Sequence, residues 1–247
     1  MTFFRFSLVA IFVQFFVQIQ AQKLVQEQNQ IWVGYMTSTR LSPRYSWWND
    51  THLVPHGFFV LRTGLTRNFQ PSSITAGYAY LLLPLSAEDQ SLKRREHRPW
   101  AQIQATFPLP NGFSVSNRIR YDARFRQTVS NGELSDGYSF VNRLRLLISV
   151  RKSINVPDQA AWKPFVSLNE ELLVNFGKEV TFNSFDQNRI SLMVGASRAN
   201  VQLQIGYMSR FVQTGYQLFV NNHTLVMWVT HRIGDSSKPR HEENVTE

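Results

Sequence analysis

The segment 113–126 places charged side chains at every second residue, which gives them a common direction in a β-strand. Its odd positions are mostly apolar or aromatic, whereas its even positions include Arg118, Arg120, Asp122, Arg124 and Arg126. Because successive side chains of a strand point to opposite faces, such a strand has one apolar face and one cationic face. Rings of arginine or lysine select anions in pores, so the chemistry that this face could perform is anion binding.

The same alternation extends the charged face to other segments and predicts a charge network inside a lumen. The predicted members of this network are Arg62, Arg118, Arg120, Asp122, Arg124, Arg143, Arg145, Glu171 and Arg189. We expect Glu171 to be the counter-ion of Arg143, Arg145 and Arg189, and its neighbour Glu170 to point the other way. The network has two interpretations. It could be structural, since buried charges must be paired, or it could form a cationic constriction that favours anions.

Signatures of enzymes are poor in this chain. Asp50 and His52 share one face of a strand and could belong to a hydrolytic triad, which is recognised by geometry and not by spacing. Glu96 and His97 are expected in a long loop, as loop charge or capping residues. The six histidines form no metal-spaced pair, and the chain has no cysteine. We therefore expect a non-enzymatic protein with no catalytic residue, metal or cofactor.

Period-two alternation dominates the chain, and no helical periodicity of useful length competes with it. Turn-forming residues such as Pro55 and Gly57, Asn131-Gly132 and Ala199-Asn200 separate the alternating segments. The eleven predicted strands are Ile31–Leu41, Tyr45–Val54, Phe58–Asn68, Ser73–Leu83, Arg98–Phe107, Phe113–Arg126, Tyr138–Lys152, Pro164–Asn175, Phe185–Arg198, Val201–Arg210 and Leu218–Ile233.

The connections between these strands alternate in length, as they do in outer-membrane barrels. The long polar connections are expected at 84–97, 127–137, 176–184 and 211–217, and the short ones at 69–72, 108–112 and 199–200, with 153–163 as the exception. The predicted fold is all-β, an antiparallel up-and-down transmembrane β-barrel of ten to twelve strands. Eleven segments were found, but bacterial single-chain barrels have even strand numbers, so we expect ten or twelve strands, with twelve preferred.

The N-terminus has the features of a secretory signal peptide. Arg5 provides a basic start, an apolar stretch follows over residues 7–19, and Ala21 ends a small-residue cleavage site. We therefore divide the chain into a cleaved signal peptide at 1–21, a lead-in at 22–30, the barrel at 31–233 and a disordered periplasmic tail at 234–247. The expected location is the cell outer membrane, with membrane lipids and the barrel-assembly machinery as partners.

The formal net charge of +9 raises the question of nucleic-acid binding. The arginines lie within alternating strands of an exported chain, and not in a helix or a lysine-rich tail, so no nucleic-acid partner is expected. Aromatic side chains near strand ends or at outward positions would form girdles at the membrane surfaces. Those considered are Trp47, Trp48, Tyr78, Tyr80, Trp100, Phe107 and Trp228. In a soluble sandwich the same residues would form the core.

Several short motifs occur in an order that resembles a known group. They are Glu96-His-Arg-Pro-Trp100, Asn117-Arg-Ile-Arg120, Arg143-Leu-Arg145, Asn175-Phe-Gly-Lys178, Phe185-Asp-Gln-Asn-Arg189 and Gly206-Tyr-Met208. Together they resemble the uncharacterised family known as domain of unknown function twenty-four ninety. The resemblance covers most of the chain after the signal peptide and implies a secreted outer-membrane β-barrel of Gram-negative bacteria. The family has no assigned activity, so the resemblance implies no mechanism.

The leading functional hypothesis is a narrow anion-leaning pore or a structural barrel, and the pore adds small anionic solutes as partners. One alternative is a barrel enzyme acting on lipid or lipopolysaccharide, for which Asp50 and His52 are the only handle. Another is a receptor that uses loops 85–97 and 127–137. A soluble periplasmic lipocalin-like binding protein also remains open, because alternation alone does not distinguish it from a membrane barrel.

Overall fold

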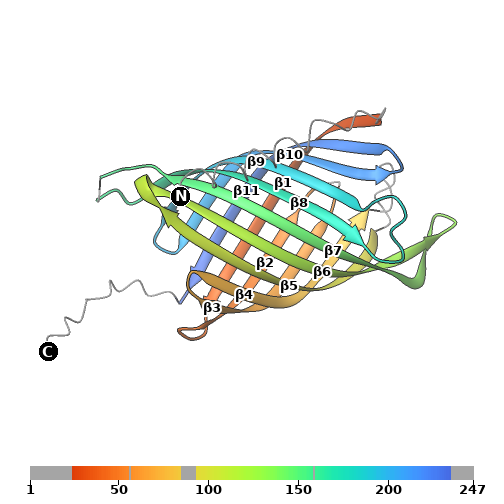
Figure 1. Cartoon of the computed structure of the whole chain (residues 1–247), viewed down its shortest axis with the longest axis horizontal. Helices are drawn as coiled ribbons and strands as arrows, with labels where there is room; N and C mark the ends of the chain where they lie inside the picture. Colours follow the sequence, from red (N-terminus) through yellow and green to blue (C-terminus); the bar gives the residue numbers. More distant parts are fainter. Residues whose placement is uncertain (1–23, 56, 85–92, 158, 235–247) are drawn as a thin grey trace, which may run out of the picture.

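The protein is a closed β-barrel of eleven strands, as a computed structural model of the chain shows (Figure 1). The structure describes residues 24–55, 57–84, 93–157 and 159–234. Its strands are β1 (Leu24–Arg40), β2 (Tyr45–Leu53), β3 (Phe59–Phe69), β4 (Ser72–Pro84), β5 (Lys93–Leu109), β6 (Phe113–Ser130), β7 (Glu133–Ser153), β8 (Lys163–Phe176), β9 (Phe185–Arg198), β10 (Val201–Gly215) and β11 (Leu218–Ile233), with a short 3₁₀ turn, η1 (Pro110–Gly112), between β5 and β6.

Every strand pairs with its sequence neighbour in antiparallel fashion, and the barrel closes between β1 and β11. That closing pair is parallel and runs from Leu24↔Leu218 to Thr39↔Ile233. A parallel closure follows from the odd number of strands, because the first and last strands of such a meander run in the same direction. The preference for an even number, and for twelve strands in particular, was therefore wrong, although all eleven expected segments form strands.

The first strand begins at Leu24, earlier than the expected Ile31, so residues 24–30 belong to the barrel wall and not to a separate lead-in. This stretch reads Leu-Val-Gln-Glu-Gln-Asn-Gln and has polar residues on both faces, which hides the alternation. Pairing with β11 supplies the backbone partners that define it as a strand. The proposed signal peptide at 1–21 and the tail beyond Gly234 lie outside the described residues.

Two connections that were expected to be long are tight turns. β6 and β7 continue to Ser130 and Glu133, joined by Asn131 and Gly132 alone. Both turn residues have positive φ, of 53° and 81°, as a two-residue turn of the type favoured in hairpins requires. Likewise only two residues separate β10 from β11. Polar strand ends were therefore mistaken for loops, and the predicted alternation of loop length is not maintained.

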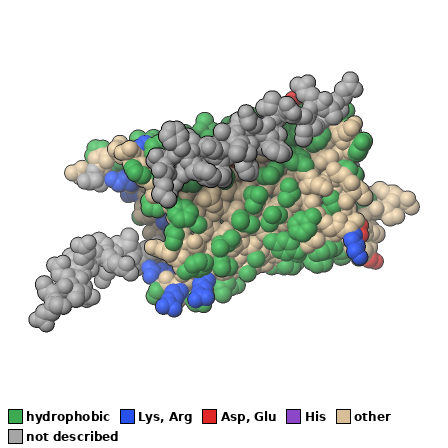
Figure 2. Space-filling view, in the orientation of Figure 1, with side chains coloured by type: hydrophobic (Ala, Val, Ile, Leu, Met, Phe, Trp, Pro, Cys, Tyr) green, Lys and Arg blue, Asp and Glu red, His purple; other side chains and the backbone are tan. Residues whose placement is uncertain are grey.

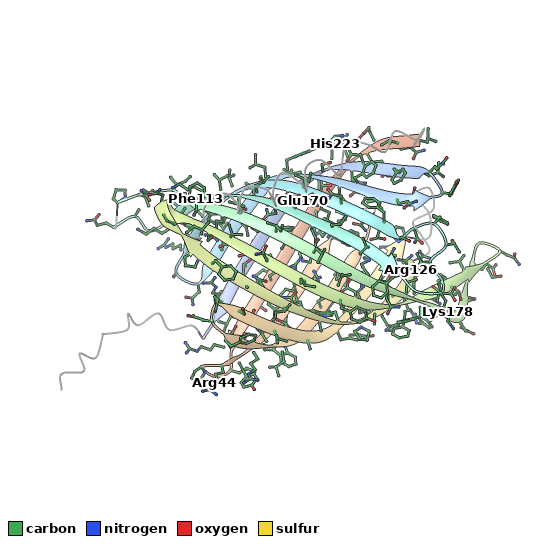
Figure 3. All side chains as sticks on the ribbon, viewed as in Figure 1. Arg44, Phe113, Arg126, Glu170, Lys178 and His223 are labelled. Carbon is green, nitrogen blue, oxygen red and sulfur yellow. The ribbon has the colours of Figure 1, made fainter. Side chains whose placement is uncertain are left out.

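The barrel has two distinguishable ends. The end that carries the β8–β9 connection, residues 177–184, is here called the mouth end, and the end that carries the β7–β8 connection, residues 154–162, is called the tail end. Figure 3 labels residues at both: Arg126 and Lys178 lie towards the mouth end, and Phe113 and Arg44 lie towards the tail end. N-terminal Leu24 of β1 starts at the mouth end, because β1 runs parallel to β11.

The outer face of the wall is apolar, and Figure 2 shows hydrophobic side chains spread over it, with Lys and Arg gathered near the ends. Aliphatic residues such as Leu168, Ile190 and Leu192 are exposed in mid-strand. Exposed aromatic residues occur nearer the strand ends: Trp47, Phe69, Phe107 and Phe113 towards the tail end, and Phe125, Tyr138, Phe140 and Phe176 towards the mouth end. In the described part of the chain, no helix is both long and apolar enough for a membrane span.

The inner face combines a charged arc with two small apolar clusters. The first cluster contains Trp32, Val54, Met193, Met208 and Val226, with Phe58 and Trp228 packed against it. The second contains Val60, Ala79, Leu81 and Trp100, with Trp48, Phe58 and Leu83 packed against it. Three tryptophans considered for outer girdles, Trp48, Trp100 and Trp228, therefore belong to the interior, because each has the parity of the inward face of its strand.

Candidate functional site

The candidate site is a cavity of about 930 Å³ inside the barrel. Its lining reaches the mouth end through Phe182 and Asn183 of the β8–β9 connection, and reaches down the barrel to Met36 and Leu147. Three carboxylates, Asp50, Glu171 and Asp186, line it, together with eleven arginines: Arg62, Arg94, Arg98, Arg118, Arg120, Arg124, Arg126, Arg143, Arg145, Arg189 and Arg210. All nine residues of the predicted network lie on the inner face. Eight of them line the cavity, and Asp122 is buried beside Arg98 and Arg145.

Glu96 anchors the part of the network nearest the mouth. Its side chain is completely buried, and its oxygens accept hydrogen bonds from Nε of Arg98 at 2.9 Å, of Arg124 at 2.8 Å and of Arg126 at 2.9 Å. The expectation that Glu96 is a loop residue was wrong, because β5 begins at Lys93. The signal was present in the sequence: Glu96 has the same parity as Arg98 and Trp100, so the inward face of that strand could have been extended to it.

Glu171 anchors the middle of the network. It accepts hydrogen bonds from Nη2 of Arg118 at 2.6 Å, Nη2 of Arg145 at 2.7 Å and Nη1 of Arg189 at 3.1 Å. Pairing of Glu171 with Arg145 and Arg189 was expected, whereas the contact with Arg118 was not. Glu170 points outward, as predicted, and accepts a hydrogen bond from Asn188 at 3.1 Å; Figure 3 labels it on the wall.

Arg143 was assigned the wrong partner. It pairs with Asp186, at 2.8 Å between Nη2 and Oδ2, and donates from Nε to Asn175 at 3.2 Å. Asp186 was not predicted as a site residue, because strict alternation would put it on the opposite face from Gln187. The β8–β9 register shifts at Leu173 and Val174, where Asp186 is the unpaired extra residue. Such a bulge turns two consecutive side chains to the same side, and both Asp186 and Gln187 line the cavity.

Asp50 and His52, the possible catalytic pair, are buried and bond to each other and to Arg62 and Trp32. Asp50 binds Nε of Arg62 at 2.8 Å and lies 3.5 Å from Nε2 of His52. The other ring nitrogen of His52, Nδ1, accepts a hydrogen bond from the indole of Trp32 at 3.0 Å. Within the described residues, both ring nitrogens thus face partners other than a hydroxyl. A triad needs one imidazole nitrogen at the nucleophile, so this arrangement does not assemble one.

Arg120 differs from the other buried arginines. Its side chain is 1% exposed, and Nε and Nη2 donate to Gln102 at 2.8 and 2.6 Å. Its guanidinium lies 4.6 Å from the ring centre of Trp100 and 5.9 Å from that of Trp48. Among the described residues it has no carboxylate within ion-pair distance, and its Nη1 atom has no hydrogen-bond partner. Its charge is therefore only partly compensated.

Arginines outnumber acids in the described interior. To the three carboxylates of the lining, Glu96 and Asp122 add two more, and Asp122 lies 3.7 Å from Arg98 and 3.8 Å from Arg145. Eleven arginines thus face five carboxylates. Arg210 resembles Arg120 in bonding to amides, those of Gln30 and Gln187, and not to an acid. Among the described residues no group of three or more His, Cys, Asp or Glu side chains could hold a metal ion.

At the tail-side limit of the cavity, inward side chains of the neighbouring strands β7, β8 and β9 bond to one another along the wall. Ser149 donates to Asn169 at 2.6 Å, and Asn169 donates to Ser191 at 3.1 Å. Phe165 and Met193 are almost fully buried beneath this chain, and the guanidinium of Arg151 lies 3.5 Å from the ring centre of Phe165. Closer to the tail end a separate cavity of about 150 Å³ is lined by Arg151, Gln202 and Arg232, among others. The inward side chains below Asn169 are therefore packed, with little surface open to the lumen.

The comparisons with known proteins agree with the motifs in the sequence. The family model described as "Protein of unknown function (DUF2490)" matches residues 29–217. The chain belongs to this family. The match extends from β1 to the end of β10 and thus includes every strand that contributes an arginine to the cavity. The comparison with curated proteins returned no match.

Proposed function

We propose that this protein is a non-enzymatic β-barrel of the bacterial outer membrane whose lumen attracts small anions from the mouth end. The observation that carries the proposal is the excess of arginine over carboxylate, eleven against five, around one cavity that reaches the mouth end. A cavity walled by one sign of charge raises the local concentration of the opposite ion. Arginine rings favour anions in pores for the same reason.

The outer face supports the membrane part of the proposal. A soluble barrel would have to expose side chains such as Ile119, Leu168 and Leu192 to water along its whole wall. Soluble monomers rarely expose contiguous apolar patches larger than a few hundred Å². An aliphatic band between aromatic strand ends is the arrangement that a bilayer and its two interfaces favour. The signal-peptide pattern at 1–21 supports export, and membrane lipids and the barrel-assembly machinery are the partners that this location implies.

The packing of inward side chains below Asn169 makes the proposed pathway small. Phe165 and Met193 are almost fully buried on the tail side of the Ser149–Asn169–Ser191 chain, and such packing does not favour a wide aqueous pore. Barrels with few strands have interiors that side chains can fill. We therefore infer low conductance with a preference for anions, and we infer that the cavity works mainly as a chamber that holds anions.

Current reversal in a salt gradient across planar bilayers tests the proposal. We expect small currents whose reversal potential has the sign of anion selectivity. The double variant Arg120→Gln, Arg210→Gln is expected to reduce that selectivity, because it removes two charges that have no acidic partner. Arg44→Gln, in the exposed β1–β2 turn, is the matched control and should change nothing. A large cation-selective current, or one that the double variant leaves unaltered, would contradict the proposal.

A further inference from the structure

The cavity has two chemically different walls. β5, β6, β7 and β9 supply nine of its eleven arginines, and these strands lie along one arc of the barrel. The opposite arc is made by β11, β1, β2, β3 and β4, which follow one another around the barrel. Besides Asp50, His52, Arg62 and several amides, that arc carries a group of apolar side chains, here called the apolar wall: Trp32, Met36, Trp48, Val60, Leu81, Leu83 and Trp228, with Phe58 from the β2–β3 connection.

The apolar wall is continuous because Phe58 belongs to both clusters of the interior. Its ring centre lies 5.0 Å from that of Trp32 in an edge-to-face contact, and Trp32 in turn lies 6.3 Å from Trp228. Interiors of membrane barrels are usually polar, so an aromatic wall in the lumen needs a reason. Part of the reason is cation–π contact, because the guanidinium groups of Arg189 and Arg210 lie 5.2 and 5.5 Å from the ring centres of Trp32 and Phe58. Attraction of small anions gives no reason for the aliphatic residues of this wall, because such ions gain nothing from contact with them.

Arg120 lies at the boundary between the arginine-rich wall and the apolar wall. Its guanidinium is flanked by Trp48 and Trp100, and Trp48 also lies beneath Arg62, at 5.6 Å from ring centre to guanidinium. The Nη1 atom of Arg120 is buried and has no partner, and the indole nitrogen of Trp228 on the apolar wall is likewise without an acceptor. Buried donors in native proteins are normally satisfied by protein, water or ligand. A ligand that brings an acceptor to Arg120 and apolar groups to the facing wall would satisfy Nη1 of Arg120 and cover the rings opposite.

We propose that the cavity binds an amphipathic anion, with a carboxylate or phosphate head at Arg120 and an apolar chain along Phe58, Trp32 and Trp228. This inference rests on the proposed anion-attracting lumen and adds the class of ligand. The volume of about 930 Å³ is at the upper end of the range of roughly 300–1,000 Å³ for small-molecule sites, which suits an elongated ligand. Arginine is suited to either head, because its planar fork matches both carboxylate and phosphate oxygens.

Quenching of tryptophan fluorescence by a brominated chain tests this directly, because Trp32, Trp48 and Trp228 line the cavity. The probe is 11-bromoundecanoate, added to the full barrel in phosphatidylcholine vesicles, and its neutral counterpart is 11-bromoundecanol. We expect saturable quenching by the acid that unbrominated undecanoate reverses, and only non-saturable quenching by the alcohol. Arg120→Gln should raise the half-saturating concentration about tenfold, the loss expected for one charge-assisted hydrogen bond. Arg44→Gln is the control and should leave it unchanged.

A second variant keeps the test valid if Arg120→Gln does not fold. Phe58→Ala removes a ring from the apolar wall but no charge, so it should weaken quenching by 11-bromoundecanoate. Competition then identifies the head. Reversal by undecanoate, by undecyl phosphate or by both supports the proposal and assigns carboxylate, phosphate or either as the preferred group.

Three results would overturn the inference. Equal saturable quenching by the alcohol would show that the head does not use Arg120. Reversal by inorganic phosphate as effective as that by undecyl phosphate would show that the apolar wall is not used. Absence of saturable quenching by both brominated chains would show that no such ligand binds. The last two leave the anion-selective reversal potential untouched, so a failure of this inference is distinguishable from a failure of the proposed function.

Discussion

Replacing Glu171 by alanine is expected to destabilise the barrel by about 3–5 kcal/mol, the cost of breaking a buried ion pair from one side, and by less where lumen water reaches the site. Glu171 holds Arg118, Arg145 and Arg189 within 3.1 Å, and its removal leaves three cations facing one another. The measurement is urea-induced unfolding of the barrel in lipid vesicles, followed by tryptophan fluorescence.

Glu170→Ala is the matched control for this variant. Glu170 precedes Glu171 in β8 but points outward and accepts a hydrogen bond from Asn188. Its replacement should cost at most about 1 kcal/mol, the usual net worth of a single hydrogen bond, because removing a carboxyl group from the outer face offsets part of that loss. Similar shifts of the unfolding midpoint for the two variants would contradict the register of β8 and, with it, the assignment of an inner and an outer face.

A charge placed on the outer wall should be the second most damaging change. Leu168→Arg puts a guanidinium in mid-strand on the apolar face, where Leu168 is 53% exposed. If this face contacts lipid, the substitution costs about 2–4 kcal/mol at the bilayer midplane, because the charge must leave water. The cost is measured as the change in folding free energy into lipid vesicles, again from urea titrations.

Phe176→Arg controls for depth in the same strand. Phe176 is also exposed and apolar but is the last residue of β8, at the mouth end. An arginine near the interface costs only about 0–1 kcal/mol. The difference between the two variants thus reports the position of the bilayer. Equal and small costs for both would mean that water, and not lipid, surrounds the middle of the wall.

Most of what the sequence predicted correctly about the strands and their inward residues came from period-two alternation. It identified all eleven strands, and it assigned Arg118, Arg120, Arg145 and Glu171 to one face, because the side-chain period of a strand is strict wherever the ladder is regular. It failed where the ladder is irregular. Asp186 occupies a bulge between β8 and β9, and a bulge depends on the register of two strands, which one sequence does not reveal.

Other errors came from closure and from strand ends, which depend on contacts distant in sequence. Residues 24–30 form strand only because they pair with β11, nearly the full length of the chain away. The partner of Arg143 could not be chosen between Glu171 and Asp186 without knowing the bulge. The apolar wall was missed for a related reason: Trp32, Trp48 and Phe58 come from separate elements, and only the closed barrel brings them to one cavity.

The most direct test of the central claim, a membrane-spanning barrel with a charged interior, is the location and migration of the full-length protein made in a Gram-negative host. Membranes are separated on a sucrose gradient, and the outer-membrane fraction is run on mildly denaturing gels with and without heating. The account predicts that the protein sediments with the outer membrane and migrates as a compact band that shifts on heating. A protein that is folded and fully soluble in the periplasmic fraction without detergent would contradict it.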